Sequence, residues 1–145
     1  VKRLKELTGR PIGVNLEPVD PDVKMESTKF ELPKGRIATA ESMRRAEELG
    51  FNFVCFTGNP GSGVTNKMIV QAVRTAKENF SGMIIAGKMH GAGVDEPVAD
   101  EESVKAMIDA GADVILVPAV GTVPGFTSDE LIKIVKIVHQ HDGLE

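Results

Sequence analysis

Lys88 and His90 lie two residues apart in residues 86–93 (AGKMHGAG), the segment whose side chains are best suited to catalysis. A lysine with a lowered pKa can form a Schiff base, and a charged lysine can stabilise a phosphate or an enolate. A histidine can act as a general acid or base near neutral pH. We predict Lys88, His90 and Glu17 as catalytic residues, with Glu17 orienting Lys88 or acting as a base. The alternative is that Lys88 pairs with Glu17 inside the fold while His90 forms only a local hydrogen bond.

Two glycine-rich loops could hold an anion beside these residues. Residues 57–65 (TGNPGSGVT) and 121–127 (GTVPGFT) each follow an apolar run and lead into a helical pattern. Glycines let backbone N–H groups approach an anion, and a helix amino terminus favours negative charge. A nucleotide P-loop is excluded because it ends in Gly-Lys-Ser/Thr, where this chain has Gly-Val-Thr. The alternative is a pair of turns with capped helices. The predicted ligand-binding or phosphate-binding residues are Asn15, Thr57, Gly58, Asn59, Gly61, Gly63, Gly121, Thr122 and Gly125.

Short apolar runs that would position these residues occur at 12–16, 53–56, 83–86 and 114–117. Each is rich in β-branched or aromatic residues and is bounded by glycine or proline, as buried strands are. Amphipathic patterns separate the runs at roughly thirty-residue spacing, which is the size of a βαβ unit. The sequence therefore predicts four consecutive βα units, with parallel strands and right-handed crossovers.

Capping residues set the expected helix ends. One helix is expected to end at Gly50, one to open at Thr65, and one to run from Asp100 to Gly111. The predicted buried positions of these three helices are Met43, Ala46, Leu49, Ile69, Val73, Ala76, Val104, Met107 and Ile108.

The last helix is expected to open with a capping box in residues 127–130, in which the glutamate reaches back to the cap backbone. Its buried face is predicted from the i, i+3, i+4, i+7 spacing of Leu131, Ile134, Val135 and Val138.

Two architectures use this repeating unit: a (β/α)8 barrel, of which the chain would be half, and a flavodoxin-like doubly wound sheet. Asn15 and Glu17 share one strand face, and Lys88 and His90 share parity with Ile84 and Ala86. Strands covered by helices on both sides should be apolar on both faces. Polar groups gathered on one face therefore favour the half barrel, with its chemistry at the carboxyl ends of the strands.

A half barrel would expose one apolar face and two strand edges, so we expect a second copy or a missing barrel half to cover them. We treat residues 1–145 as one βα-repeat domain, a segment of a longer barrel. Residues 1–10 would be the end of a preceding helix, and residues 144–145 are compatible with an expression-tag remnant.

The composition excludes several classes of function. Hydrophobic residues make up 41% and charged residues 26%, which is typical of a soluble globular protein. A net charge of −4 without a basic cluster argues against nucleic acid as a partner. No apolar run is long enough to cross a bilayer, so no membrane partner is expected. Cys55 is the only cysteine, which favours a reducing, cytoplasmic setting.

Asp20 and Asp22, in Val19-Asp20-Pro21-Asp22-Val23, suggest a different chemistry. Haloacid-dehalogenase-type phosphohydrolases place such a pair after their first strand, with the first aspartate as nucleophile, and later a Ser/Thr and a lysine. Thr57 and Lys88 follow in that order. The chain departs from that pattern at Lys24, where Thr or Val is preferred, and it has no acidic pair at residues 119–121.

The chain also resembles, over nearly its whole length, a bacterial family of uncharacterised proteins labelled haloacid dehalogenase-like hydrolases. The resemblance rests on residues 9–21, 57–65, 85–97 and 111–127. It implies phosphohydrolase activity that would use Asp20 and Mg²⁺, and it supplies no catalytic residue beyond that motif.

We predict an enzyme that acts on a small phosphorylated or carboxylated metabolite in a lyase, aldolase or isomerase reaction. The hydrolase is the first alternative, and a non-catalytic binding or assembly module is the second. No cofactor is predicted, and no metal site beyond the weak candidates Asp20 and Asp22, with Mg²⁺ entering only through the hydrolase alternative.

Overall fold

A computed structural model describes residues 1–18, 37–57, 63–87, 100–121 and 126–141. Its sheet has four strands: β1 (Gly13–Asn15), β2 (Phe53–Phe56), β3 (Met83–Ala86) and β4 (Val114–Ile115). All neighbours pair in parallel, and their order in the sheet is their order in the chain, β1-β2-β3-β4. The predicted strands are therefore all present, although the first and last are shorter than their apolar runs.

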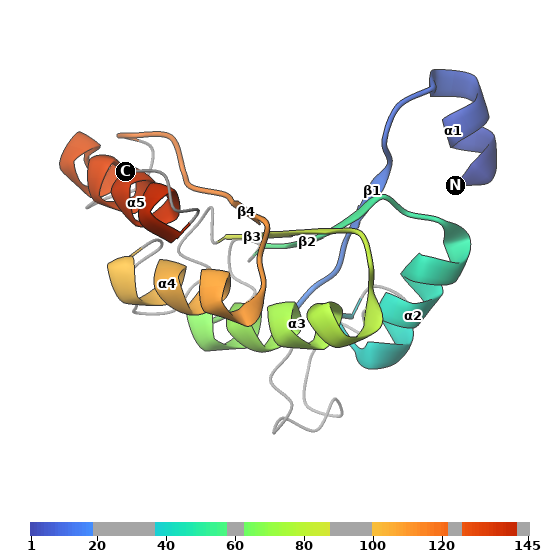
Figure 1. Ribbon diagram of the computed structural model, residues 1–145, viewed down its shortest axis with the longest axis horizontal. Helices are drawn as coiled ribbons and strands as arrows, with labels where there is room; N and C mark the ends of the chain where they lie inside the picture. The colour runs from blue at the N-terminus through green and yellow to red at the C-terminus, as the bar shows by residue number, and fades with distance from the viewer. Residues whose placement is uncertain (19–36, 58–62, 88–99, 122–125, 142–145) are drawn as a thin grey trace.

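Helices alternate with the strands. They are α1 (Lys2–Thr8), α2 (Ala40–Leu49), α3 (Asn66–Asn79), α4 (Glu101–Ala110) and α5 (Ser128–His141). Figure 1 shows α2, α3 and α4 in a row along one face of the sheet, with α5 beyond α4 and α1 standing apart from the row.

The strand order decides between the two predicted architectures. A flavodoxin-like sheet reverses its strand order and carries helices on both faces. Here the order never reverses, and the row of α2, α3 and α4 covers one face only (Figure 1). The half-barrel prediction is confirmed, and the doubly wound alternative is wrong.

Side-chain alternation explains why one face takes the helices. Val54 and Phe56 of β2 and Ile84 and Ala86 of β3 are buried under the helices, as is Leu16 just past β1. The intervening positions belong to the opposite face, where Met83 is 48% and Val114 is 36% exposed. One face of each strand thus builds the core of this chain, while the other face leaves apolar side chains in solvent.

The amino-terminal edge of the sheet is closed by two polar residues that precede strands. Asn52 accepts a hydrogen bond at its Oδ1 from the Ile12 N–H (3.0 Å) and donates its own N–H to the Ile12 carbonyl (2.7 Å). Asp113 repeats this exchange with Ile84, at 2.8 Å in each direction. Both side chains therefore accept hydrogen bonds from backbone N–H groups that the parallel strand pairing leaves unpaired at this edge.

The predicted helix ends are confirmed where a capping residue marks them. Thr65 and Asp100 accept hydrogen bonds from the third residue of α3 and α4. Gly50 and Gly111 end α2 and α4 in the left-handed conformation.

Two details of the predicted buried faces are wrong. Leu49 at the end of α2 and Val135 in α5 are each 42% exposed. In α5 the predicted Ile134 is buried, and Ile137 is buried in place of Val135, because the helix packs against α4 at one side and its contact stripe is narrow.

Candidate functional site

Parallel strands end at one common edge, and the described part of that edge brings together two of the predicted ligand-binding residues. Asn15 ends β1, and Thr57 follows the last residue of β2. The Asn15 Nδ2 donates a hydrogen bond to the Thr57 Oγ1 at 3.4 Å. The register pairs Asn15 with Cys55, so alternation places Thr57 on the same sheet face, opposite the buried Val54 and Phe56. A polar pair therefore lies at the carboxyl edge, on the face without the helix row.

Glu17 lies two residues beyond Asn15 and is half-buried between Leu16 and Pro18, which are both buried. Its backbone is fixed by a parallel bridge to Ile37, in which the Ala38 N–H donates to the Glu17 carbonyl at 2.9 Å. The bridge to Ile37 thus holds the backbone of Glu17, the predicted catalytic carboxylate, in place near the end of β1.

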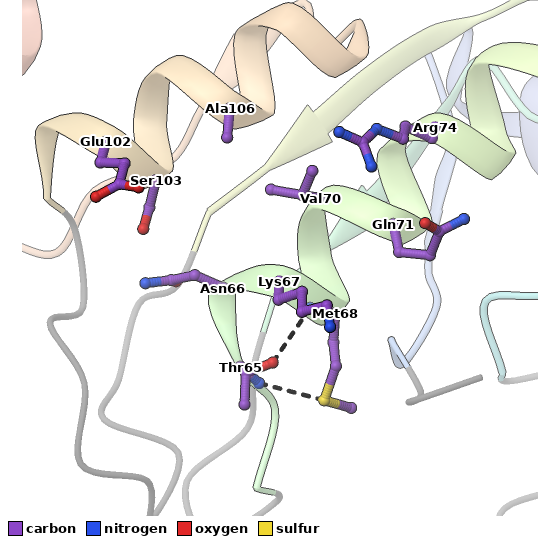
Figure 2. Close-up of a pocket in the computed structure, with 10 residues that line it drawn as sticks. All are labelled: Thr65, Asn66, Lys67, Met68, Val70, Gln71, Arg74, Glu102, Ser103 and Ala106. Carbon is purple, nitrogen blue, oxygen red and sulfur yellow. Dashed lines mark hydrogen bonds between the residues drawn. The ribbon is translucent and has the colours of Figure 1, made fainter. Parts of the chain in front are cut away.

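The described end of the first glycine-rich loop combines a turn with a helix start. Gly63 has a φ of +73°, a conformation that favours glycine. The Thr65 Oγ1 accepts from the Met68 N–H at 3.2 Å, and the Thr65 N–H points to the Met68 sulfur at 3.4 Å. Figure 2 shows both contacts at the start of α3. A thioether here takes the place of the Glu or Gln of an ordinary capping box.

Beside this helix start lies a pocket of about 330 Å³ between α3 and the beginning of α4 (Figure 2). Lys67, Gln71 and Arg74 line it from α3, and Glu102 and Ser103 line it from α4. None of these residues was predicted from the sequence. The i, i+4, i+7 spacing of Lys67, Gln71 and Arg74 could have shown one polar helix face, but not the neighbouring helix that turns this face into a pocket.

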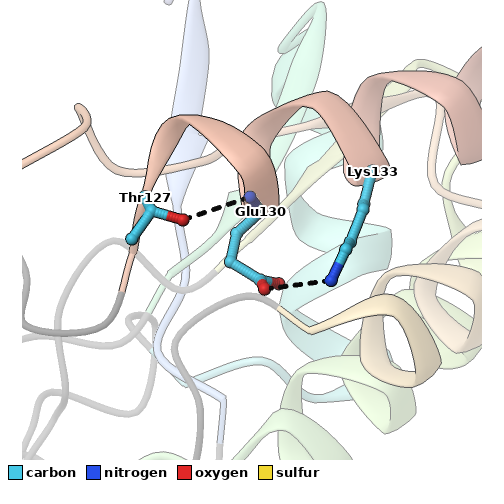
Figure 3. A network of polar contacts seen from close by, with 3 residues as sticks. All are labelled: Thr127, Glu130 and Lys133. Atoms are coloured by element: carbon cyan, nitrogen blue, oxygen red, sulfur yellow. Dashed lines mark hydrogen bonds and ion pairs between the residues drawn. The ribbon is translucent and has the colours of Figure 1, made fainter.

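The second glycine-rich loop is described only at its two ends. Gly121 has a φ of +83°, and its N–H donates to the Phe126 carbonyl at 3.4 Å. The Thr127 Oγ1 accepts from the Glu130 N–H at 3.4 Å, which is half of the predicted capping box. The Glu130 Oε1 accepts instead from the Lys133 Nζ at 3.3 Å (Figure 3). The predicted return of this glutamate to the cap backbone is not what the structure shows.

Several predicted site residues lie outside the described residues. They are Asp20, Asp22, Gly58, Asn59, Gly61, Lys88, His90, Thr122 and Gly125.

The parity argument for Lys88 and His90 needs correction. Ile84 and Ala86, with which they share parity, face the helices rather than the inside of a barrel. The strand ends at Ala86, so alternation cannot be extended from β3 to position 88.

Burial raises the pKa of the Cys55 thiol, which lies on the same sheet face as Asn15. Within the described ranges, no group of three or more His, Cys, Asp or Glu residues is arranged to hold a metal ion. No helix in the described part of the chain is long and apolar enough to span a membrane.

Two solved structures share this fold. One is (S)-3-O-geranylgeranylglyceryl phosphate synthase from Thermoplasma acidophilum in complex with its substrate sn-glycerol-1-phosphate. It has 22% sequence identity and a TM-score of 0.57, over 96% of this chain and 55% of that one. The other is thiamine phosphate pyrophosphorylase from Pyrococcus furiosus, with 16% identity and a TM-score of 0.50, over 89% of this chain and 60% of that one.

Both structures are barrel-type enzymes, and at these identities the likeness establishes the fold of this chain. The chain spans between half and two thirds of their lengths. A search of curated protein sequences finds no match.

The resemblance to haloacid dehalogenase-like hydrolases is wrong. Its family assignment is overturned by a different family model, and the structural neighbours are barrel-type synthases rather than hydrolases of that kind. Because the model of the domain of unknown function DUF7916 matches residues 1–145, the chain belongs to the DUF7916 family.

Proposed function

We propose that this chain forms the ligand-binding half of a barrel enzyme that acts on a small phosphorylated metabolite in the cytoplasm. The observation that carries the proposal is the Asn15–Thr57 hydrogen bond at the carboxyl edge, on the sheet face without the helix row. In barrel enzymes the residues at this edge carry the chemistry, whereas those at the opposite edge serve stability. The neighbouring structures support the ligand class, because one is named for a phosphate product and holds sn-glycerol-1-phosphate.

The phosphate would lie between the polar pair and the start of α3. The Asn15 amide and the Thr57 hydroxyl can donate hydrogen bonds to phosphate oxygens, and both belong to strand ends rather than to flexible loops. The first turn of α3 adds backbone N–H groups and the positive end of its dipole. Gly63 lets the backbone turn into that helix.

The chemical step would fall to residues that follow β3 and β1. We assign Lys88 as nucleophile or electrophile, His90 as acid or base, and Glu17 as the group that orients Lys88. Gly87 supports this assignment because it is buried and its N–H donates to the Phe56 carbonyl at 3.1 Å. The chain is thus held tightly up to the residue before Lys88. The reaction would be a lyase, aldolase or isomerase step.

An assigned amide NMR titration of the chain with inorganic phosphate and with sn-glycerol-1-phosphate tests the binding site. We expect saturable shifts in residues 57–65, 88–93 and 121–127. Thr57→Val removes one hydroxyl donor, so affinity should fall roughly three- to tenfold, the range expected for one hydrogen bond. Thr75→Val is the matched control, because the Thr75 hydroxyl bonds the Gln71 carbonyl within α3. Equal affinities for both variants, or shifts elsewhere, would refute the proposed site.

A further inference from the structure

The pocket between α3 and the beginning of α4 exists because α4 presents short side chains toward α3. Ser103 and Ala106, three positions apart on α4, line the pocket and cannot reach across it. Figure 2 shows Ala106 and Val70 of α3 pointing toward one another across the gap. The remaining volume of about 330 Å³ lies at the lower end of the range for small-molecule sites, about 300–1,000 Å³.

The middle of this pocket is apolar and its two ends are charged. Met68, Val70 and Ala106 supply the apolar side chains. Arg74, on α3, lies at one end of the gap, and Glu102, on the first turn of α4, lies at the other (Figure 2). An apolar surface between a cationic and an anionic end can orient a ligand that is charged at one end only.

The charged side chains at the pocket are free to bind a ligand. Within the ranges that the structure describes, no hydrogen bond or ion pair engages the side chain of Lys67, Arg74 or Glu102. Arg45, by contrast, is paired with Glu48 at 3.1 Å on the surface of α2. The guanidinium of Arg74 therefore keeps all its N–H donors available beside an empty space.

We propose that the α3–α4 pocket binds a small monocarboxylate with an apolar body, and that its carboxylate pairs with Arg74. Lys67 and Arg74 contribute a charge of +2 to the lining and Glu102 contributes −1, so the lining carries a net charge of +1. A monocarboxylate balances this charge, whereas a phosphate dianion would leave an excess of −1. The planar guanidinium matches a carboxylate through two parallel N–H···O bonds.

The two ends of the pocket also fix the direction in which the ligand binds. Glu102 repels a carboxylate, so the acid group lies at the Arg74 end, and the apolar body covers Val70 and Ala106. The Ser103 hydroxyl, near Glu102, remains available to a hydrogen-bonding group at the far end of the ligand.

This pocket is separate from the proposed phosphate site and does not depend on the proposed function. It lies among the helices, whereas the Asn15–Thr57 pair lies on the sheet face without the helix row. Of the segments assigned to the phosphate, the pocket includes only Thr65. The carboxylate would therefore bind on the opposite side of the sheet from the proposed chemistry.

An assigned amide NMR titration with benzoate tests the pocket. We expect saturable shifts confined to residues 65–74 and 102–106, with a dissociation constant of roughly 1–10 mM for so small a ligand. Benzamide has the same ring without the charge, and acetate has the charge without the ring, so both should bind at least about tenfold more weakly than benzoate. If either one binds as well as benzoate, the proposed ligand class is overturned.

Two variants test which side chains make the site. Arg74→Gln should raise the benzoate dissociation constant at least about tenfold, because a charge-assisted contact is lost. Arg45→Gln is the matched control and should leave the dissociation constant unchanged, because Arg45 lies outside the pocket. Ala106→Phe should abolish the saturable shifts by filling the gap, and its urea midpoint should not fall, because the ring enters existing space.

Three results would overturn the proposal. The first is the absence of saturable shifts up to about 50 mM benzoate. The second is equal binding by the wild-type chain and the Arg74→Gln or Ala106→Phe variant. The third is a set of benzoate shifts centred on residues 57–63, which would move the acid to the proposed phosphate site. A failure of phosphate to bind would leave this proposal intact and would count only against the proposed function.

Discussion

Replacing Gly87 by alanine tests how closely β3 and β4 must approach at the edge that carries the site. Gly87 follows the last residue of β3, and the next residue on the neighbouring strand, Leu116, donates its N–H to the Ala86 carbonyl at 2.8 Å. A Cβ at position 87 would lie 2.1 Å from the Leu116 carbonyl oxygen and 2.8 Å from its carbonyl carbon. Real Cβ contacts stay above 3.0 Å, so the two strands must separate by at least 0.9 Å (3.0 minus 2.1).

The expected cost follows from what blocks the methyl group. Overpacking a well-packed site forces side-chain and backbone shifts that cost about 1–3 kcal/mol. Here the obstacle is backbone that is tied to β3 by a hydrogen bond, so we expect a loss at the upper end, about 3 kcal/mol. Against a typical domain stability of 5–15 kcal/mol, this is a large fraction. The urea midpoint should fall by about 1 M or more.

Urea unfolding followed by far-UV circular dichroism measures this loss. Gly63→Ala is the matched control, because Gly63 has a φ of +73° and no atom within 4 Å of an added Cβ. That variant should cost only the backbone strain, about 1 kcal/mol. If Gly87→Ala loses no more stability than Gly63→Ala, the close approach of Leu116 does not constrain the sheet and the reasoning is refuted.

Two further predictions concern pH. Hydrogen bonds from the Ser81 hydroxyl and, to a smaller extent, from the Ser81 N–H lower the pKa of Glu47. The ionised carboxylate therefore stabilises the fold fully above pH 4.5, the ordinary pKa of a glutamate. This contribution is lost as the pH falls through the lowered pKa. Glu47→Gln should therefore lower the urea midpoint at pH 7 but not at a pH below that pKa, and an equal difference at both would contradict this origin. Burial raises the pKa of Cys55, so its reaction with a thiol reagent should be slower than that of free cysteine at pH 8 and should keep accelerating above the pH at which free cysteine levels off. A rate profile that matches free cysteine would show an accessible, unperturbed thiol.

The fold could be predicted from the sequence where local chemistry and global packing agree. The runs at 53–56 and 83–86 match β2 and β3 residue for residue, because a strand buried on one face and flanked by turns has few alternatives. Thr65, Asp100, Gly50 and Gly111 mark helix ends through contacts that reach only three or four residues along the chain. Such short-range contacts can be read from spacing alone.

The errors arise where the outcome depends on distant neighbours. The spacing in α5 made Val135 equivalent to Ile134, but only the position of α4 decides which of them is covered. Alternation along the strand grouped Lys88 and His90 with Ile84 and Ala86, yet alternation alone does not say which face of the sheet the helices cover. In the same way, Glu130 could reach its cap or Lys133, and the sequence permits both.

The candidate site was predicted as a set of separate residues, and the register is what joins them. Asn15 and Thr57 are 42 positions apart, and both were expected to bind the ligand. Their contact depends on the pairing of Asn15 with Cys55, and a shift of one residue would have turned Thr57 to the other face. The pocket between α3 and α4 escaped prediction for a related reason, because it exists only through the packing of two helices.

The two edges of the sheet differ in how firmly their polar groups are engaged. At the amino-terminal edge, the Asn52 and Asp113 side chains accept backbone N–H groups at 3.0 and 2.8 Å, and each of these residues returns a backbone bond. At the carboxyl edge, Asn15 and Thr57 meet through one side-chain contact at 3.4 Å, near the limit of a hydrogen bond. A ligand that replaced the Asn15–Thr57 contact would sacrifice little stability, whereas one that displaced Asn52 or Asp113 would leave strand amides without a partner. The carboxyl edge is therefore where this chain can exchange an internal contact for a bound anion at low cost.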